Sequence, residues 1–252
     1  MDPAKLATQL IVDGYTVIPE AVHGEELERM SGAFERRAAE IGKRWMSWDE
    51  IDRVPELVAY IGHPKVMEVI DAFYEHFGQT AAFACSSGIR DVYDPENPPG
   101  EFDASDLANA PVGWHDDVTG MKKPIPEFLE TTVTSLIYLD ETFADNGAYC
   151  TSVGSHHLVC RNDNGTPILA DRTKAVDHCE LKALPVKAGS VIAHRGHNWH
   201  GVVPPRQRRR VMLQCFAGRE VYDIQDGHTQ VSEEVVQMVP EAQRKYLCWY
   251  SR

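Results

Sequence analysis

The sequence lacks an excess of positive charge, and this excludes one large class of functions. Its 252 residues contain 25 Lys and Arg against 38 Asp and Glu, so the formal net charge is −13 at pH 7. A protein that binds nucleic acid generally needs a basic surface to neutralise phosphates. We therefore expect no nucleic-acid partner.

Long hydrophobic runs are also missing. No run of 18 or more apolar residues occurs, and the first ten residues lack the basic and apolar regions of a secretory signal. These observations predict a cytoplasmic protein without a membrane partner.

Cysteine is present but lacks the spacing of a metal or redox motif. The six cysteines are Cys85, Cys150, Cys160, Cys179, Cys215 and Cys248. No two of them form a C-x-x-C pair, so neither a zinc ribbon nor a redox pair is supported. In a cytoplasmic chain we expect free, largely buried thiols.

The first third of the chain has the pattern of helices. Residues 3–13 predict a short helix that ends at Gly14. Residues 24–41 place apolar side chains at helical spacing, with charges on the opposite face. Residues 55–77 predict one or two further helices, broken near His63, which precedes a proline.

From about residue 80 the pattern changes to short strands separated by Gly, Pro, Asp and Asn. Including one near the N-terminus, the strands are expected within residues 14–22, 81–93, 133–140, 147–153, 181–186, 190–194 and 209–218. Many short strands are typical of a sandwich or barrel. Two polar interruptions, 94–111 and 161–174, are expected to be lids or binding loops.

We expect a single domain over residues 1–252. Residues 1–78 would be a mainly helical support, residues 79–219 a β core, and residues 220–252 a C-terminal extension. All-β domains commonly reach this length.

The segment 188–213 combines two kinds of chemistry. A predicted strand leads into a connection with three histidines, and a second strand follows an arginine cluster. These residues are His194, His197, His200, Arg206, Arg208, Arg209 and Arg210. Histidine is the commonest metal ligand, and a guanidinium can bind a carboxylate through two hydrogen bonds. A metal site beside an anion site is therefore predicted; a solvated basic turn is the alternative for the arginines.

A His-x-acid pair far upstream could complete the metal site. His115 and Asp117 follow a short extended segment, and residues i and i+2 of such a segment point the same way. The other two His-x-acid pairs have simpler explanations. The pair at 23 and 25 opens a helix, where an acid suits the helix dipole, and the pair at 178 and 180 lies too close to His200.

Two imidazoles and one carboxylate leave coordination positions open, which is the pattern of non-heme iron(II) oxygenases. We therefore predict that His115, Asp117 and His200 form one metal site. Asp116 should point away, as a solvated acid or in a hydrogen bond to a loop. We expect His194 in the core or beside the site, and His197 in an exposed turn.

Several segments together resemble the phytanoyl-CoA dioxygenase-like (PhyH-type) branch of the iron(II)/2-oxoglutarate-dependent dioxygenases. They are GYTVIPEAV, GWHDD, LDETFADNGAY, SVGSHHL, AGSVIAHRGHNWHG and RRRVMLQCFA. Their order and spacing span most of the chain. Two turns depart from the family pattern: Val153 replaces a proline, and Ser190 replaces an aspartate. Both departures concern turns more than the chemistry.

The resemblance implies roles for particular residues. His115, Asp117 and His200 would bind iron(II), and Arg209 would pair with the distal carboxylate of 2-oxoglutarate. Arg208 and Arg210 are rivals of Arg209, because a one-residue slip in register turns a strand over. Thr134 or Ser135 would give a second hydrogen bond to that carboxylate.

The resemblance also implies a fold and a reaction. The fold would be a double-stranded β-helix (a jelly roll, cupin-like), mostly β with N-terminal helices. With Fe(2+), 2-oxoglutarate and O2 the enzyme would oxidise a C–H bond of a small-molecule substrate and release succinate and CO2. Because Asp117 occupies the position that halogenating relatives leave to chloride, we expect hydroxylation or a related oxidation such as desaturation.

Five residues are candidates for the substrate pocket: Arg90, Phe102, Trp114, Tyr149 and Trp199. For the aromatic residues, packing in the core is the alternative. Two other functions remain open, a catalytically silent jelly-roll protein that binds a ligand and a zinc hydrolase with the same His/Asp/His site. The sequence leaves open whether the protein is a monomer or a homodimer.

Overall fold

The computed structural model describes residues 2–117, 132–158, 160–161, 167–168, 172–219 and 231–247. Most of the predicted loop 161–174, and much of the predicted C-terminal extension, lie outside these residues. None of the described helices is both long and apolar enough to cross a membrane.

The predicted N-terminal helices are present. They are α1 (Pro3–Asp13), α2 (Glu25–Ile41), α3 (Trp48–Ile51), α4 (Pro55–Val58) and α5 (Pro64–His76). Asp2 caps α1 by accepting a hydrogen bond from the Ala4 N–H, and Gly14 ends the helix with a φ of 82°. The break at His63 separates α4 from α5, as predicted from the following proline.

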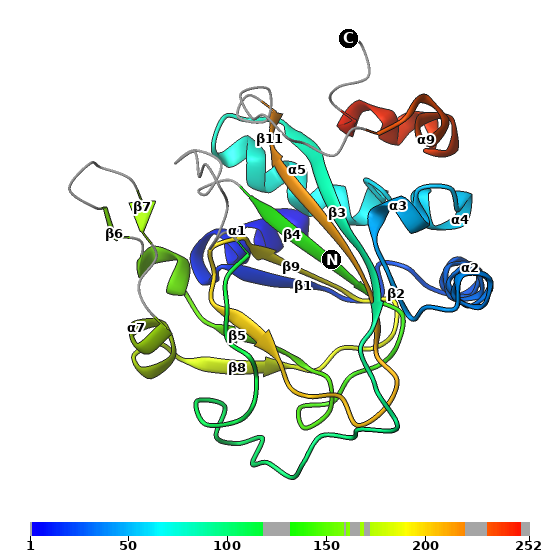
Figure 1. Ribbon diagram of the computed structural model, residues 1–252. Coiled ribbons are helices and arrows are strands. Elements are labelled where there is room, and N and C mark those ends of the chain that lie inside the picture. Colours follow the sequence, from blue (N-terminus) through cyan, green and yellow to red (C-terminus); the bar gives the residue numbers. More distant parts are fainter. Residues whose placement is uncertain are drawn as a thin grey trace.

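Two antiparallel sheets form the β part of the molecule (Figure 1). The larger sheet has the order β1-β9-β4-β11-β3-β2, from Tyr15–Ile18, Val191–Arg195, Val133–Tyr138, Arg210–Gly218, Ala81–Asp91 and Trp45–Met46. The smaller sheet has the order β10-β5-β8, from His200–Val202, Tyr149–Ser152 and Leu181–Leu184. The short strands β6 (Cys160–Arg161) and β7 (Pro167–Ile168) pair antiparallel with each other.

Helices cover one face of the larger sheet (Figure 1). Leu10 of α1 and Phe73 of α5 share a buried apolar cluster with Val133 and Ile137 of β4. The alternate residues of β4 point to the other face, where Tyr138 packs with side chains of the smaller sheet. The site described below lies between the two sheets.

Additional helices follow the first β segments. They are α7 (Arg172–Asp177), α9 (Glu233–Met238) and the 3₁₀ turns η1 (Ser155–Leu158) and η2 (Glu241–Tyr246). Val235 and Tyr246 belong to the same apolar cluster as α1 and α5. The chain is therefore a mixed α/β structure with antiparallel sheets, and "mostly β" understates its helices.

The turn before β9 depends on a glycine. Gly189 has a φ of +81°, and an added Cβ would collide with the backbone carbonyl of Val22. Its N–H donates to the Tyr138 carbonyl, and its own carbonyl accepts from the Val22 N–H. This glycine joins β9 to both β4 and the N-terminal segment.

We expect Gly189→Ala to lower the free energy of unfolding by about 3 kcal/mol, from a left-handed φ and a backbone clash together. Gly42→Ala is the matched control, because Gly42 has a φ of +66° with nothing near an added Cβ. Its expected loss is about 1 kcal/mol. Urea unfolding measures both values, and equal losses would show that the clash is relieved.

Candidate metal centre

The chain brings His115 and His200 together through backbone hydrogen bonds. The N–H of each residue donates to the carbonyl of the other, at 2.8 Å in both directions. The Asp117 N–H donates to the Gly196 carbonyl at 2.8 Å. The His-x-Asp segment is thus held along the connection between β9 and β10, as if it were a further strand.

The three predicted ligands offer donor atoms that lie within 4.8 Å of one another. The rings of His115 and His200 are 4.4 Å apart, and His200 Nε2 is 3.5 Å from Asp117 Oδ1. His200 is buried, whereas His115 and Asp117 are exposed on the cavity side. The predicted metal trio is therefore present as a group.

Hydrogen bonds orient both imidazole rings. Nδ1 of His115 lies 2.8 Å from the Gly113 carbonyl, and Nδ1 of His200 lies 2.9 Å from the Asn198 carbonyl. A carbonyl can only accept, so each Nδ1 carries a proton, and Nε2 is the ring nitrogen that each histidine can offer to a metal. This is the arrangement that a metal ligand requires.

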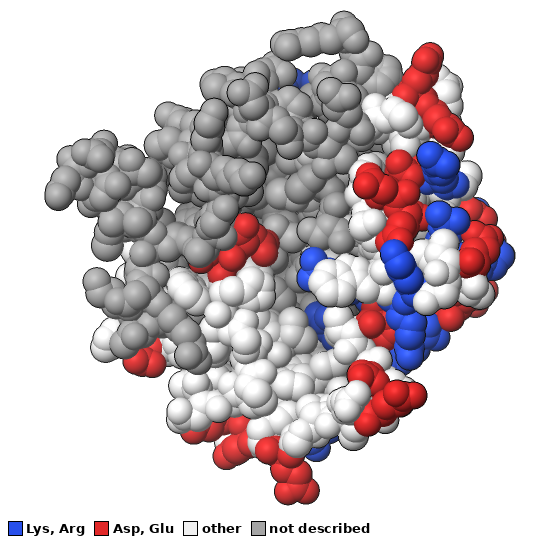
Figure 2. Space-filling model, viewed as in Figure 1, with Lys and Arg blue, Asp and Glu red and all other residues white. Residues whose placement is uncertain are grey.

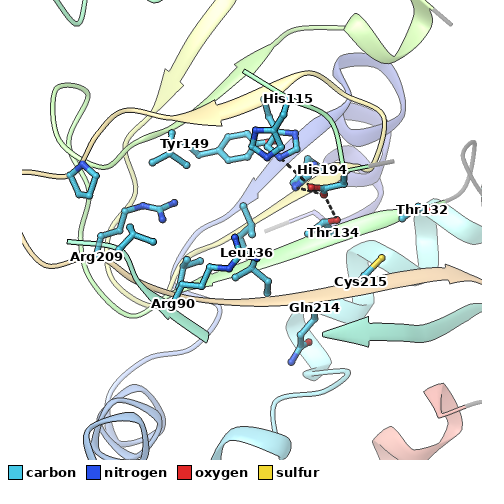
Figure 3. Close-up of a pocket in the computed structure, with 17 residues that line it drawn as sticks. Arg90, His115, Thr132, Thr134, Leu136, Tyr149, His194, Arg209, Gln214 and Cys215 are labelled. Atoms are coloured by element: carbon cyan, nitrogen blue, oxygen red, sulfur yellow. Dashed lines mark hydrogen bonds and ion pairs between the residues drawn. The ribbon is translucent and has the colours of Figure 1, made fainter. Parts of the chain in front are cut away.

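The carboxylate is oriented in the same way. The Thr134 hydroxyl donates to Asp117 Oδ2 at 2.8 Å, and His194 Nε2 lies 3.6 Å from the same oxygen (Figure 3). Burial tends to raise the pKa of Asp117, but His200, His194 and Thr134 outweigh it and hold the pKa well below its usual range. Burial lowers the pKa of His194 to about 3 and also lowers that of His115. Burial tends to lower the pKa of His200, but Asp117 outweighs it and raises that pKa. Asp117 is therefore negatively charged at neutral pH, and a metal ion at His200 Nε2 would compete with a proton there.

This donor set fits a divalent metal ion. It supplies two imidazole nitrogens and one carboxylate oxygen, so an octahedral ion would keep open positions toward the cavity. His194 stands beside the trio, with its ring centre 4.3 Å from that of His200. This agrees with the expectation that His194 lies beside the site.

The cavity next to the trio has a volume of about 440 Å³. It opens between the two sheets, and Figure 2 shows it as a hollow with Lys or Arg atoms inside. Its lining residues are Arg90, Val92, His115, Asp117, Thr132, Thr134, Leu136, Tyr149, His194, His200, Val202, Pro205, Arg209, Val211, Leu213, Gln214 and Cys215.

Of the three rival arginines, only Arg209 lines this cavity. It is 4% exposed; its Nε donates to the Gly147 carbonyl at 2.8 Å and its Nη2 to the Tyr138 hydroxyl at 3.1 Å. Both partners are neutral, and the described residues contain no acidic partner for it. A buried guanidinium without a counter-charge is well suited to an anionic ligand.

The other two arginines are used elsewhere. Arg208 pairs with Asp91 at 2.9 Å and with Glu35 at 2.6 Å. Arg210 pairs with Asp140 at 2.6 Å and with the same Glu35 at 2.8 Å. These ion pairs join the end of β11 to β3 and α2.

The remaining candidates divide into two groups. Arg90 and Tyr149 line the cavity. Phe102, Trp114 and Trp199 pack instead in a separate apolar cluster around the buried Val203. These three aromatic side chains therefore pack in the core, which was the alternative to lining the substrate pocket.

The two hydroxyls proposed for 2-oxoglutarate face opposite ways. Thr134 points into the cavity and donates to Asp117, whereas Ser135 is buried outside the cavity lining and its Oγ has no hydrogen-bond partner. The prediction did not foresee that the Thr134 hydroxyl meets the carboxylate ligand.

Two expectations about neighbouring residues need correction. His197 was expected in an exposed turn, but it is 2% exposed, and its ring centre lies 5.9 Å from that of His156 in η1. Asp116 was expected to be a solvated acid or to form a hydrogen bond to a loop; it is 6% exposed, which excludes the solvated alternative.

Loss of the Thr134 hydroxyl should weaken metal binding. We expect Thr134→Val to lower the affinity for Mn(II) about 10- to 100-fold, because the carboxylate ligand loses the donor that orients it. Ser135→Ala is the matched control and should change the affinity less than about twofold. Anaerobic titration calorimetry measures both, and an equal loss in the two variants would contradict a role for Thr134 in orienting Asp117.

Structural comparison shows which known proteins share this fold. SnoK, a non-heme α-ketoglutarate-dependent carbocyclase from nogalamycin biosynthesis, superposes with a TM-score of 0.64 at 20% identity, over 85% of this chain and 83% of SnoK. The epimerase SnoN, solved with Fe3+, α-ketoglutarate and nogalamycin RO, gives 0.59 at 19% identity, over 86% and 85% of the two chains. AviO1 from Streptomyces viridochromogenes Tue57 gives 0.61 at 18% identity, over 86% and 95%. The chain therefore has the fold of these enzymes.

The family is set by sequence. The sequence model of the phytanoyl-CoA dioxygenase (PhyH) family matches residues 11–204, which include all three predicted ligands. The chain belongs to this family of iron- and 2-oxoglutarate-dependent oxygenases and carries its His-Asp-His trio. No curated protein matches it by sequence. Because the family match ends before Arg209, the assignment of that residue rests on the geometry of the cavity.

Proposed function

We propose that this protein hydroxylates an unactivated C–H bond of a small molecule, using iron(II), 2-oxoglutarate and O2, and releases succinate and CO2. The observation that carries the proposal is the pairing of two features in one cavity. His115, Asp117 and His200 offer donor atoms within 4.8 Å of one another, and Arg209 presents a buried guanidinium without an acidic partner among the described residues.

Each residue would have a defined task. His115, Asp117 and His200 would hold the iron, and Arg209 would bind the distal carboxylate of 2-oxoglutarate. Tyr138 and the Gly147 carbonyl fix the direction of the guanidinium, so it needs little reordering on binding. The bound iron, with 2-oxoglutarate and O2, supplies the oxidising power.

The carboxylate ligand favours hydroxylation over halogenation. With iron bound, Asp117 would hold a coordination position that would otherwise be open to chloride. The same group of structures includes a carbocyclase and an epimerase, and hydroxylation is therefore our own proposal for this chain.

We also assign the two sheets to the halves of a double-stranded β-helix. In support, the larger and smaller antiparallel sheets share one apolar cluster, formed by Tyr138, Ile192 and Val211 with Tyr149. The trio lies where the smaller sheet begins, at His200 of β10.

The test has two stages. The protein is first incubated with iron(II), ascorbate and 2-oxoglutarate under air, and succinate is measured; zinc(II) replaces iron in the control. Metal-specific succinate formation is expected, and its absence would contradict the proposal. A library of small molecules is then screened by mass spectrometry for products that gain one oxygen atom; a cyclised or epimerised product of unchanged composition would contradict hydroxylation.

A further inference from the structure

Arg90 is a second arginine of the cavity, and it has no acidic partner among the described residues. It lies on β3 opposite Val211 of β11, and both side chains line the cavity. Its Nε is buried without a hydrogen-bond partner. A buried polar group without a partner is unfavourable, so this side chain is suited to a ligand that the protein binds.

Arg90 is held differently from Arg209. Its guanidinium carbon lies 4.6 Å from the centre of the Trp45 ring, a contact that leaves the N–H groups free to donate. Trp45 is 58% exposed, so Arg90 stands near the outer edge of the cavity. In Figure 3 both arginines extend into the cavity from the side away from His115 and His194.

The charges of the cavity show what Arg90 would bind. Asp117, Arg90 and Arg209 are the only Asp, Glu, Lys or Arg residues that line it within the described part of the chain. With iron(II) and 2-oxoglutarate bound, the ion, Asp117, the cosubstrate and Arg209 together have no net charge. The positive charge of Arg90 then has no counter-charge in the cavity. Burial and Arg209 both lower the pKa of Arg90, whereas Asp117 raises it. One further negative charge would complete the site.

We propose that Arg90 binds a carboxylate of the primary substrate, so that this substrate is a small carboxylic acid with an apolar body. A carboxylate carries a single charge, whereas a phosphate monoester carries about two at pH 7. A guanidinium also matches the planar shape of a carboxylate. The inference rests on the proposed function, because the charge balance includes iron and 2-oxoglutarate.

The rest of the cavity fits an apolar body. Leu136, Val202 and Val211 line it. The exposed Val92, two residues after Arg90 in the sequence, lines it as well. The volume of about 440 Å³ must also hold 2-oxoglutarate, so the substrate is small.

The first experiment separates Arg90 from the cosubstrate. Binding of 2-oxoglutarate to the Mn(II)-loaded protein is measured by anaerobic calorimetry for wild type, Arg90→Gln and Arg209→Gln. Arg36→Gln removes the same charge from an exposed position on α2, where Arg36 pairs with Glu56, and is the control. We expect Arg209→Gln to weaken binding about 100-fold, and the other two variants to change it less than about threefold.

The second experiment uses matched probes. Benzoate, 3-phenylpropionate and hexanoate are compared with their carboxamides for binding to the Mn(II)- and 2-oxoglutarate-loaded protein. We expect at least one acid to bind about tenfold more tightly than its amide in wild type and in Arg36→Gln. This preference should disappear in Arg90→Gln.

The outcomes are distinguishable. If Arg90→Gln weakens 2-oxoglutarate binding as much as Arg209→Gln does, Arg90 belongs to the cosubstrate site and the inference is overturned. It is also overturned if wild type shows no preference for acids, or if Arg90→Gln retains the preference. If wild-type protein binds no 2-oxoglutarate in the presence of metal, the proposed function itself fails.

Discussion

Replacement of Asp117 by Ala should abolish the iron-dependent conversion of 2-oxoglutarate to succinate. The carboxylate is one of only three protein ligands in the proposed site, and its pKa lies well below the usual range, so it is ionised at neutral pH. Changes to residues that merely orient a ligand lower metal affinity or activity 10- to 100-fold. Loss of the ligand should therefore lower succinate formation about 1,000-fold or more.

The variant should still fold. Asp117 is exposed toward the cavity, and its side chain contacts Thr134, His194 and His200 rather than the apolar core. Asp49→Ala is the control, since Asp49 is exposed on α3 and does not line the cavity. Thermal unfolding with and without Mn(II) should show metal stabilisation in the control but not in Asp117→Ala. Succinate formation by Asp117→Ala at the wild-type rate would show that the metal is held by other residues.

Arg209→Gln and Arg208→Gln should have opposite effects, although the two residues are adjacent. Arg209 is buried in the cavity with two neutral partners, so its loss should raise the concentration of 2-oxoglutarate needed for half-maximal succinate formation about 100-fold. Its effect on the free energy of unfolding should be small, because no acid loses its partner.

For Arg208→Gln we expect normal use of 2-oxoglutarate and lower stability. Arg208 pairs with Asp91, whose side chain is completely buried and keeps only Arg44 as a cationic partner after the change. The loss should be about 1–3 kcal/mol of unfolding free energy. Titration of the cosubstrate and urea unfolding test the pair of variants. A loss of 2-oxoglutarate affinity in Arg208→Gln alone would reverse our assignment.

The metal trio could be predicted because its signal is local. The i, i+2 spacing of His115 and Asp117 puts both side chains on one side of an extended segment, and the sequence around His200 supplies the third ligand. The choice among the arginines could not be settled in the same way, because neighbouring strand residues alternate in direction. It required the acidic partners of Arg208 and Arg210, which come from α2, β3 and the end of β4.

Long-range packing explains what the sequence did not reveal. The predicted helices and the seven predicted strands are present, but the local pattern did not indicate that His197 is buried. It also could not decide between the cavity and the core for Trp114 and Trp199, which share a cluster away from the cavity. The short strand β10 (His200–Val202) was also missed, because its pairing with β5 is not visible in a three-residue pattern. The extent of the single domain stays a prediction.

The reciprocal backbone bonds between His115 and His200 affect how easily the site can accept an ion. Each imidazole is held by a hydrogen bond at Nδ1, and the backbones of His115 and His200 are bonded to each other. Folding has therefore already restricted their rotation, and little conformational entropy would remain to be lost when a cation arrives. The centre should thus be preorganised, exchanging one divalent ion for another without rearrangement of the surrounding sheets.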